Sequence, residues 1–166
     1  MLLADVTAYN VSIFIHIAAA VVGFGSTYAL SITFPVALKL DPRHLPYVHA
    51  LSTAIGRYMA TPGLVIVLIT GFYQVSKGDW DLGDAWIAIT LGIVVVLGGL
   101  NGAYFIPSDR RLRAMVERDI AAAPPGGEVT VSDEYQRGAR VQGMVGALAG
   151  VLVLLAIFLM VTKPGA

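Results

Sequence analysis

Four apolar segments that contain no Asp, Glu, Lys or Arg dominate the sequence. They cover residues 11–38, 58–75, 85–106 and 141–161. A helix that crosses the hydrocarbon core of a bilayer needs about 20 predominantly apolar residues. Because lipid offers no hydrogen bonds, such segments satisfy their backbone groups internally as helices. The sequence therefore predicts an all-α polytopic membrane protein: one domain over residues 1–166, folded as an antiparallel four-helix transmembrane bundle.

The composition agrees with membrane lipid as the main partner. The chain is 57% hydrophobic and 13% charged, whereas soluble domains carry about 25% charged residues. A formal net charge of zero argues against a nucleic-acid partner, and the absence of cysteine excludes disulfides, thiolate nucleophiles and cysteine metal sites.

The basic residues predict the orientation in the membrane, because cytoplasmic loops are enriched in Lys and Arg. Nine cations lie in the connections at one end of the predicted bundle and two, Lys77 and Lys163, at the other. The nine are Lys39, Arg43, Arg57, Arg110, Arg111, Arg113, Arg118, Arg137 and Arg140. We expect a bacterial plasma-membrane protein with both termini outside and with loops 39–57 and 107–140 in the cytoplasm.

Several residues suggest how the helices begin, extend and end. Residues 47–57 are expected to extend the second helix beyond the membrane. Pro62 should kink that helix, with Thr61 satisfying a freed carbonyl. Pro107 is expected to bend or end the third helix, after which Ser108 or Asp109 would cap a polar helix. Ser132 is expected to cap the fourth.

Glycines four residues apart occur in the last two segments, and small residues allow membrane helices to approach closely. The pairs lie at similar depth and comprise Gly98, Gly102, Gly146 and Gly150. They predict helix packing within the chain, or packing between chains as the alternative.

His16 is the one histidine inside an apolar segment. Its neighbours at helical spacing are small or weakly polar, so the imidazole should face the bundle interior. An ionisable residue inside a span is a functional hypothesis by default; a structural hydrogen bond to a hydroxyl or a carbonyl is the alternative. His44 and His49 lie too far along the chain to share a metal with His16, so no metal site and no catalytic residue are predicted. A haem b, which needs one axial histidine, is possible.

A second polar group lies at similar depth on four helices and comprises Ser31, Tyr58, Asn101 and Gln142. Such residues commonly form hydrogen bonds between helices, and a small polar ligand pocket is the alternative.

The stretches "FIHIAAAVVGFG", "ITGFYQVSKGDWDLGDAWI" and "YFIPSDRRLR" resemble a bacterial family of small four-span integral membrane proteins with a domain-of-unknown-function label. That resemblance implies the fold and no activity. A more distant likeness is to membrane four-helix proteins of the copper-resistance D type and the haem-carrying protoporphyrinogen oxidase type, which implies His16 as a haem ligand. This chain lacks their nearby Trp and the basic residue inside a later span.

Three functions follow as hypotheses. The first is a non-enzymatic bundle that acts as an accessory subunit or homo-oligomer. The second is a haem-binding redox or haem-handling protein that uses His16. The third is a small-molecule carrier that works as an oligomer.

Overall fold

The computed structural model describes residues 6–78 and 80–165, and in these ranges every regular element is a helix. The first helix is α1 (Ala8–Leu40), followed by the short 3₁₀ turn η1 (Pro42–His44). The second long helix consists of α2 (Leu45–Ile55), the π-helical segment η2 (Gly56–Ala60) and α3 (Thr61–Lys77). The third consists of α4 (Ala85–Gly99), the π-helical segment η3 (Leu100–Phe105) and α5 (Ile106–Ala122), and the fourth is α6 (Asp133–Thr162).

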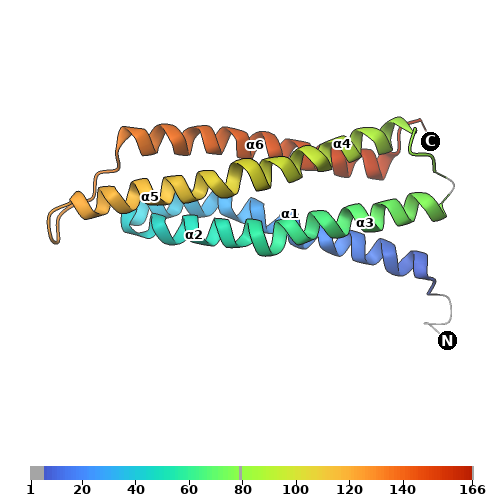
Figure 1. Cartoon of the computed structure of the whole chain (residues 1–166), viewed down its shortest axis with the longest axis horizontal. Helices are drawn as coiled ribbons and strands as arrows, with labels where there is room; N and C mark the ends of the chain where they lie inside the picture. Colours follow the sequence, from blue (N-terminus) through green and yellow to red (C-terminus); the bar gives the residue numbers. More distant parts are fainter. Residues whose placement is uncertain (1–5, 79, 166) are drawn as a thin grey trace.

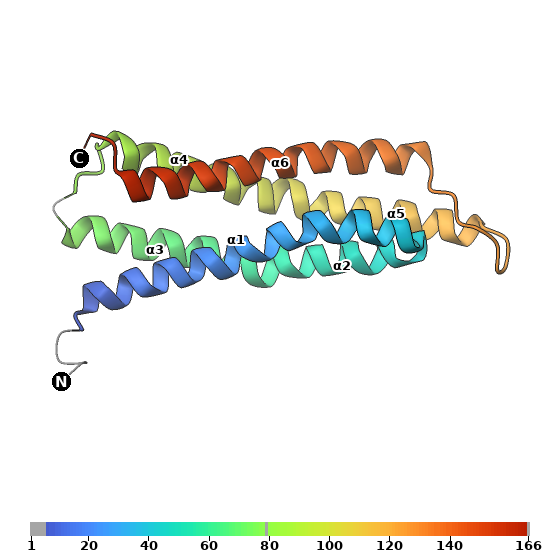
Figure 2. The same cartoon turned by 180° about the vertical axis from the view of Figure 1, so that it is seen from behind.

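These four helices form a long bundle (Figure 1). All four are long and apolar enough to cross a membrane, which agrees with the predicted fold class. The start of α1, the α3–α4 connection and the end of α6 lie at one end. The α1–α2 turn and the α5–α6 connection lie at the opposite end, which we call the arginine-rich end because the nine cations lie toward it. Figure 2 shows the same arrangement from behind.

The bundle contains two separate apolar cores. The core nearer the termini is built around Leu64, Val94 and Leu97, with Val153 from α6. The core at the arginine-rich end is built around Leu45, Leu112 and Val116. No buried residue belongs to both clusters among the described residues. At 36 and 38 residues, the second and third helices are about 55 Å long, well beyond the ~30 Å hydrocarbon core. The second and third helices are therefore longer than the hydrocarbon core is thick.

Local signals in the sequence account for most helix boundaries. The Ser132 hydroxyl accepts a hydrogen bond from the backbone N–H of Tyr135 (3.3 Å), so the predicted cap of α6 is confirmed. The predicted extension of the second helix is also confirmed, as α2. Thr61 Oγ1 donates to the Gly56 carbonyl (2.8 Å), which also accepts from the Thr61 backbone N–H, so this carbonyl is not one that Pro62 frees.

Pro107 was predicted to bend or end the third helix, and an end at this position is wrong. The helix runs without interruption from Ala85 to Ala122, and Ser108 and Asp109 cap nothing. A π-helical segment precedes Pro107, just as another precedes Pro62. The wider π turn changes which carbonyl faces the proline ring, so the clash and lost donor that normally break a helix are absorbed there.

Candidate functional site

A buried cluster of polar side chains joins α2, α5 and α6 at the arginine-rich end. We call it the inner polar network, and it comprises His49, Ser52, Ser108, Asp109, Tyr135 and Gln142. His49 and Asp109 are each 1% exposed and Tyr135 is 3% exposed. Buried polar groups are costly unless they are hydrogen-bonded, so the partners of each group decide what this site can do.

Asp109 is the acceptor at the centre of the inner polar network. Its Oδ1 lies 2.9 Å from His49 Nδ1 and 2.7 Å from Gln142 Nε2, and its Oδ2 accepts from the Ser52 hydroxyl. The Ser108 hydroxyl donates to Gln142 Oε1 (2.6 Å), which orients the amide so that its N–H₂ faces the carboxylate. Three donors from two neighbouring helices therefore satisfy the carboxylate.

His49 uses both ring nitrogens. Nδ1 faces Asp109, and Nε2 lies 3.0 Å from the Tyr135 hydroxyl. Burial, together with the charge of Asp109, raises the pKa of Tyr135 to about 12; Tyr135 precedes the apolar segment 141–161. The phenol is therefore protonated at neutral pH, so its O–H donates to Nε2 when the imidazole is neutral. The Nδ1–H then donates to Asp109, and the ring of Phe34 from α1 packs against the imidazole at 4.8 Å between centroids.

Sequence reasoning did not find His49, Asp109 and Tyr135 as a site, because it placed them beyond the spans. The sequence did contain a signal. His49 lies at helical spacing on the same buried face as Leu45, Val48 and Gly56. Asp109 lies in the same way on the buried face of Leu112 and Val116. Polar residues in apolar stripes of facing helices imply a shared hydrogen bond.

His16 lies in the half of α1 nearer the N-terminus and is 8% exposed. The Thr70 hydroxyl donates to the Ile66 carbonyl (2.6 Å), so its oxygen accepts from His16 Nδ1–H at 2.8 Å. The imidazole also packs against Gly71, where a Cβ would lie 3.5 Å from His16 Cε1. The helices thus hold the ring in a hydrogen bond within the bundle.

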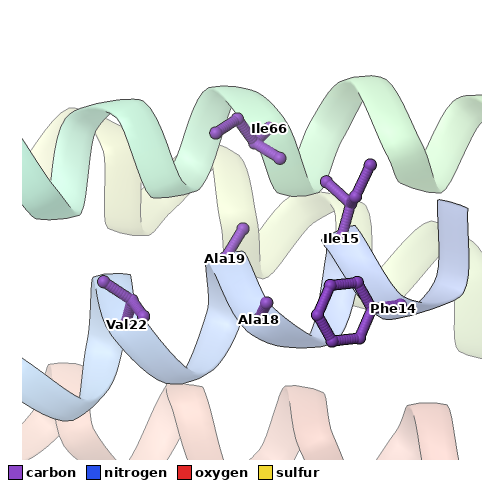
Figure 3. Close-up of a pocket in the computed structure, with 6 residues that line it drawn as sticks. All are labelled: Phe14, Ile15, Ala18, Ala19, Val22 and Ile66. Carbon is purple, nitrogen blue, oxygen red and sulfur yellow. The ribbon is translucent and has the colours of Figure 1, made fainter. Parts of the chain in front are cut away.

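Two shallow apolar grooves follow the α1–α3 seam near His16. One, of about 260 Å³, is lined by Phe14, Ile15, Ala18, Ala19, Val22 and Ile66 (Figure 3). The other, of about 360 Å³, is lined by Ala8, Val11, Ser12, Ile15, Ile69, Thr70 and Tyr73. His16 lines neither groove. It is buried against Gly71 with its Nδ1 bonded to Thr70, which is the structural hydrogen bond that the sequence offered as the alternative to haem ligation.

The four residues predicted as one intramembrane polar cluster have separate partners. Ser31 donates to the Tyr28 carbonyl in its own helix, and Tyr58 is 72% exposed. Asn101 Nδ2 donates to the Gly56 carbonyl (3.0 Å) and to Thr61 Oγ1 (2.9 Å). Gln142 belongs to the inner polar network. The Asn101 amide therefore links the two π-helical segments directly, a role that helical spacing alone does not reveal.

Close glycine packing occurs between α1 and α3, rather than between the third and fourth helices as predicted. A Cβ on Gly63 would lie 3.0 Å from the Gly23 Cα and 3.1 Å from the Ala19 carbonyl oxygen, so α1 and α3 touch backbone to backbone. Of the glycines singled out from the sequence, Gly150 contacts the Tyr28 ring of α1. A Cβ on Gly98, Gly102 or Gly146 would meet no heavy atom within 4 Å, which leaves packing between chains as the open hypothesis for these three.

Residues 6–78 and 80–165 contain no group of three or more His, Cys, Asp or Glu side chains that could hold one metal ion. A family described as "Predicted integral membrane protein (DUF2269)" matches residues 11–164. No curated protein and no solved structure matches the chain.

Proposed function

Because the chain belongs to the predicted integral membrane protein family DUF2269, we propose that it is a non-enzymatic helical bundle that acts as an accessory or oligomeric subunit in a bacterial plasma membrane. The observation that carries the proposal is the inner polar network. Its carboxylate, imidazole and phenol bind one another across three helices, and the three residues are at most 3% exposed. These are the groups best suited to acid–base chemistry, and they are used to hold helices together.

The glycines without neighbours support an oligomeric role. Gly98 and Gly102 lie one helical turn apart on α4 and η3, and Gly146 lies on α6. Each leaves open space where a Cβ would be. Since small residues are the common means of close approach between membrane helices, these positions suit a second copy or another membrane subunit.

The mass of the detergent-solubilised protein tests the oligomeric role. Light scattering with the detergent contribution subtracted is expected to give a multiple of 17.5 kDa or a complex with another membrane protein. Gly98→Leu and Gly146→Leu should each lower that mass, whereas Gly25→Leu on α1, which also meets nothing within 4 Å, should not. A wild-type protein that remains a 17.5 kDa monomer and copurifies alone would contradict the proposal.

The proposed orientation places the arginine-rich end in the cytoplasm, supported by the nine-to-two distribution of cations. The chain has no cysteine, so single cysteines report topology without background. Ser76→Cys and Thr130→Cys are exposed positions near opposite ends. A membrane-impermeant maleimide applied to intact spheroplasts should label Ser76→Cys, and should label Thr130→Cys only after lysis. The reverse pattern would overturn this orientation.

A haem-handling role is the hypothesis that the geometry favours least. An optical spectrum of the purified protein distinguishes a haem-handling protein from a non-enzymatic bundle. We expect no Soret band in the wild type, in His16→Ala or in the matched variant Thr70→Val, which removes only the hydrogen-bond partner. A Soret band that disappears in His16→Ala and persists in Thr70→Val would make His16 a haem ligand and overturn the non-enzymatic proposal.

A further inference from the structure

The cations at the arginine-rich end fall into two groups. Arg43, Arg111, Arg113 and Arg118 each lie within 4.0 Å of a carboxylate, for example Arg113 Nε at 2.8 Å from Glu117. The other five form no ion pair among the residues that the structure describes, and all five are exposed: Lys39, Arg57, Arg110, Arg137 and Arg140. A guanidinium is always charged and presents donors that match a phosphate or carboxylate. Of these five cations, Arg57 and Arg110 lie on two helices that face each other through the Ser52–Asp109 and Gly56–Asn101 hydrogen bonds, so their position decides whether they can bind one anion from outside the chain.

Arg57 and Arg110 lie on the same side of one helix seam. Arg57 directly follows Gly56, which faces Asn101 and Ile106, and Arg110 directly follows Asp109, which faces Ser52. The two helices are antiparallel. In facing antiparallel helices, the residue after each interface residue turns to the same side, because each helix rotates by about 100° per residue. Both guanidinium groups therefore flank the α2–α5 seam.

The two arginines also lie close in depth. Ser52 binds Asp109, so Arg110 is one residue from that level and Arg57 is five residues from it in the opposite direction. At 1.5 Å per residue, the two Cα atoms are separated by about 9 Å along the bundle axis. The headgroup layer on each side of a bilayer is about 5–8 Å thick, and long basic side chains extend to it from either side. One phosphate-bearing headgroup is within reach of both.

The surroundings of Arg57 favour a lipid over a free anion. Tyr58 and Met59, the next two residues, are exposed apolar side chains, and the apolar segment 58–75 begins there. An acyl chain would cover these side chains while its phosphate lies at Arg57. A free phosphate ion would leave them uncovered.

We propose that Arg57 and Arg110 bind the phosphate of an anionic phospholipid headgroup at the α2–α5 seam. The inference requires that the protein lies in a membrane. It does not depend on which leaflet the arginine-rich end faces, or on the accessory role proposed above. A monomeric protein or an inverted topology would overturn that role and leave this site intact.

Lipid titration of the full chain in detergent, read by native mass spectrometry, tests the site. Phosphatidylglycerol is expected to bind at least about tenfold more tightly than phosphatidylcholine. R57Q/R110Q should weaken phosphatidylglycerol binding by about 25-fold, since each cation near an anionic surface contributes about fivefold and the two contributions multiply. The matched control R43Q/R113Q removes the same charge from ion-paired arginines and should change binding by less than about twofold.

Three results would overturn the proposal. One is an equal loss of binding in R57Q/R110Q and R43Q/R113Q, which would make net charge the cause. Another is equal affinity for the two lipids. The third is displacement of phosphatidylglycerol by an equal concentration of inorganic phosphate, which would make the site one for free phosphate. If R57Q/R110Q does not fold, R57K/R110K, which keeps the charge and loses the planar donor pair, should weaken binding by about threefold; unchanged affinity would contradict the proposal.

Discussion

The Nδ1 of His49 lies 2.9 Å from Oδ1 of Asp109, with both side chains almost completely removed from solvent and carried by different helices. Asp109→Ala would leave His49, Ser52 and Gln142 without their acceptor. Because a buried donor left without its acceptor costs about 1–3 kcal/mol and three donors lose theirs, we expect the free energy of unfolding to fall by about 3 kcal/mol or more. Reversible unfolding in mixed micelles measures it.

Glu117→Ala is the matched control for Asp109→Ala. It removes a carboxylate from the same helix, where Glu117 pairs with Arg113 in an exposed i, i+4 geometry. Exposed pairs contribute about 0.2–1 kcal/mol. Similar losses in the two variants would mean that the inner polar network contributes no more to stability than a surface ion pair.

Tyr135 should titrate at unusually high pH. The folded-state pKa of about 12 is above the ordinary value of about 10, because the buried phenolate is disfavoured. The protonated phenol therefore contributes stability that is fully present below about pH 10 and is lost as pH rises toward 12. Ultraviolet titration of the tyrosines should contain a component near pH 12 that Tyr135→Phe removes. If the variant and the wild type titrate identically, the phenol is not held in this environment.

The contact between Gly23 and Gly63 should be intolerant of a single methyl group. The Cβ of Gly63→Ala would meet backbone atoms at 3.0–3.1 Å, and backbone cannot move aside cheaply. Overpacking of this kind costs about 1–3 kcal/mol. Gly99→Ala, at a helical position where a Cβ meets nothing within 4 Å, is expected to be neutral or slightly stabilising, since Ala has the higher helix propensity. Unfolding experiments on both variants compare them directly, and an equal effect would contradict the close approach of α1 and α3.

Asn101→Leu should loosen the link between the two π-helical segments. It removes two hydrogen bonds, to the Gly56 carbonyl and to Thr61 Oγ1. Since hydrogen bonds between membrane helices contribute about 0.6 kcal/mol on average, we expect a loss of about 1 kcal/mol. Spin labels at Arg57→Cys and Ala103→Cys, both exposed, should give a broader distance distribution by pulsed electron paramagnetic resonance. If the same two labels give an equally narrow distribution with and without Asn101→Leu, the Asn101 side chain does not hold the two π-helical segments together.

The four helices were predictable because hydropathy reports burial in lipid directly, without knowledge of tertiary contacts. The Ser132 cap was predictable for a related reason: it depends on residues close together in sequence. Pro107 was misjudged because its effect depends on how the preceding turn is wound. A π-helical turn leaves no mark in the pattern of apolar residues.

The inner polar network could not be assembled from the sequence, although each of its residues was visible. Tyr135 and His49 are 86 residues apart, and their contact depends on the rotation and the axial offset of two helices. A shift of one residue turns a side chain by about 100°. Spacing therefore predicted His16 to face inward, but it did not pair Asn101 with Gly56 or Gln142 with Asp109.

The separation of the two apolar cores affects how the protein unfolds. Since the described parts of the chain share no buried apolar residue between the clusters, opening one cluster removes no buried apolar side chain from the other. Cooperative units of this kind exchange amide hydrogens with distinct free energies. Amide exchange is therefore expected to resolve two opening free energies, one for each cluster, with a substitution in one cluster changing mainly its own.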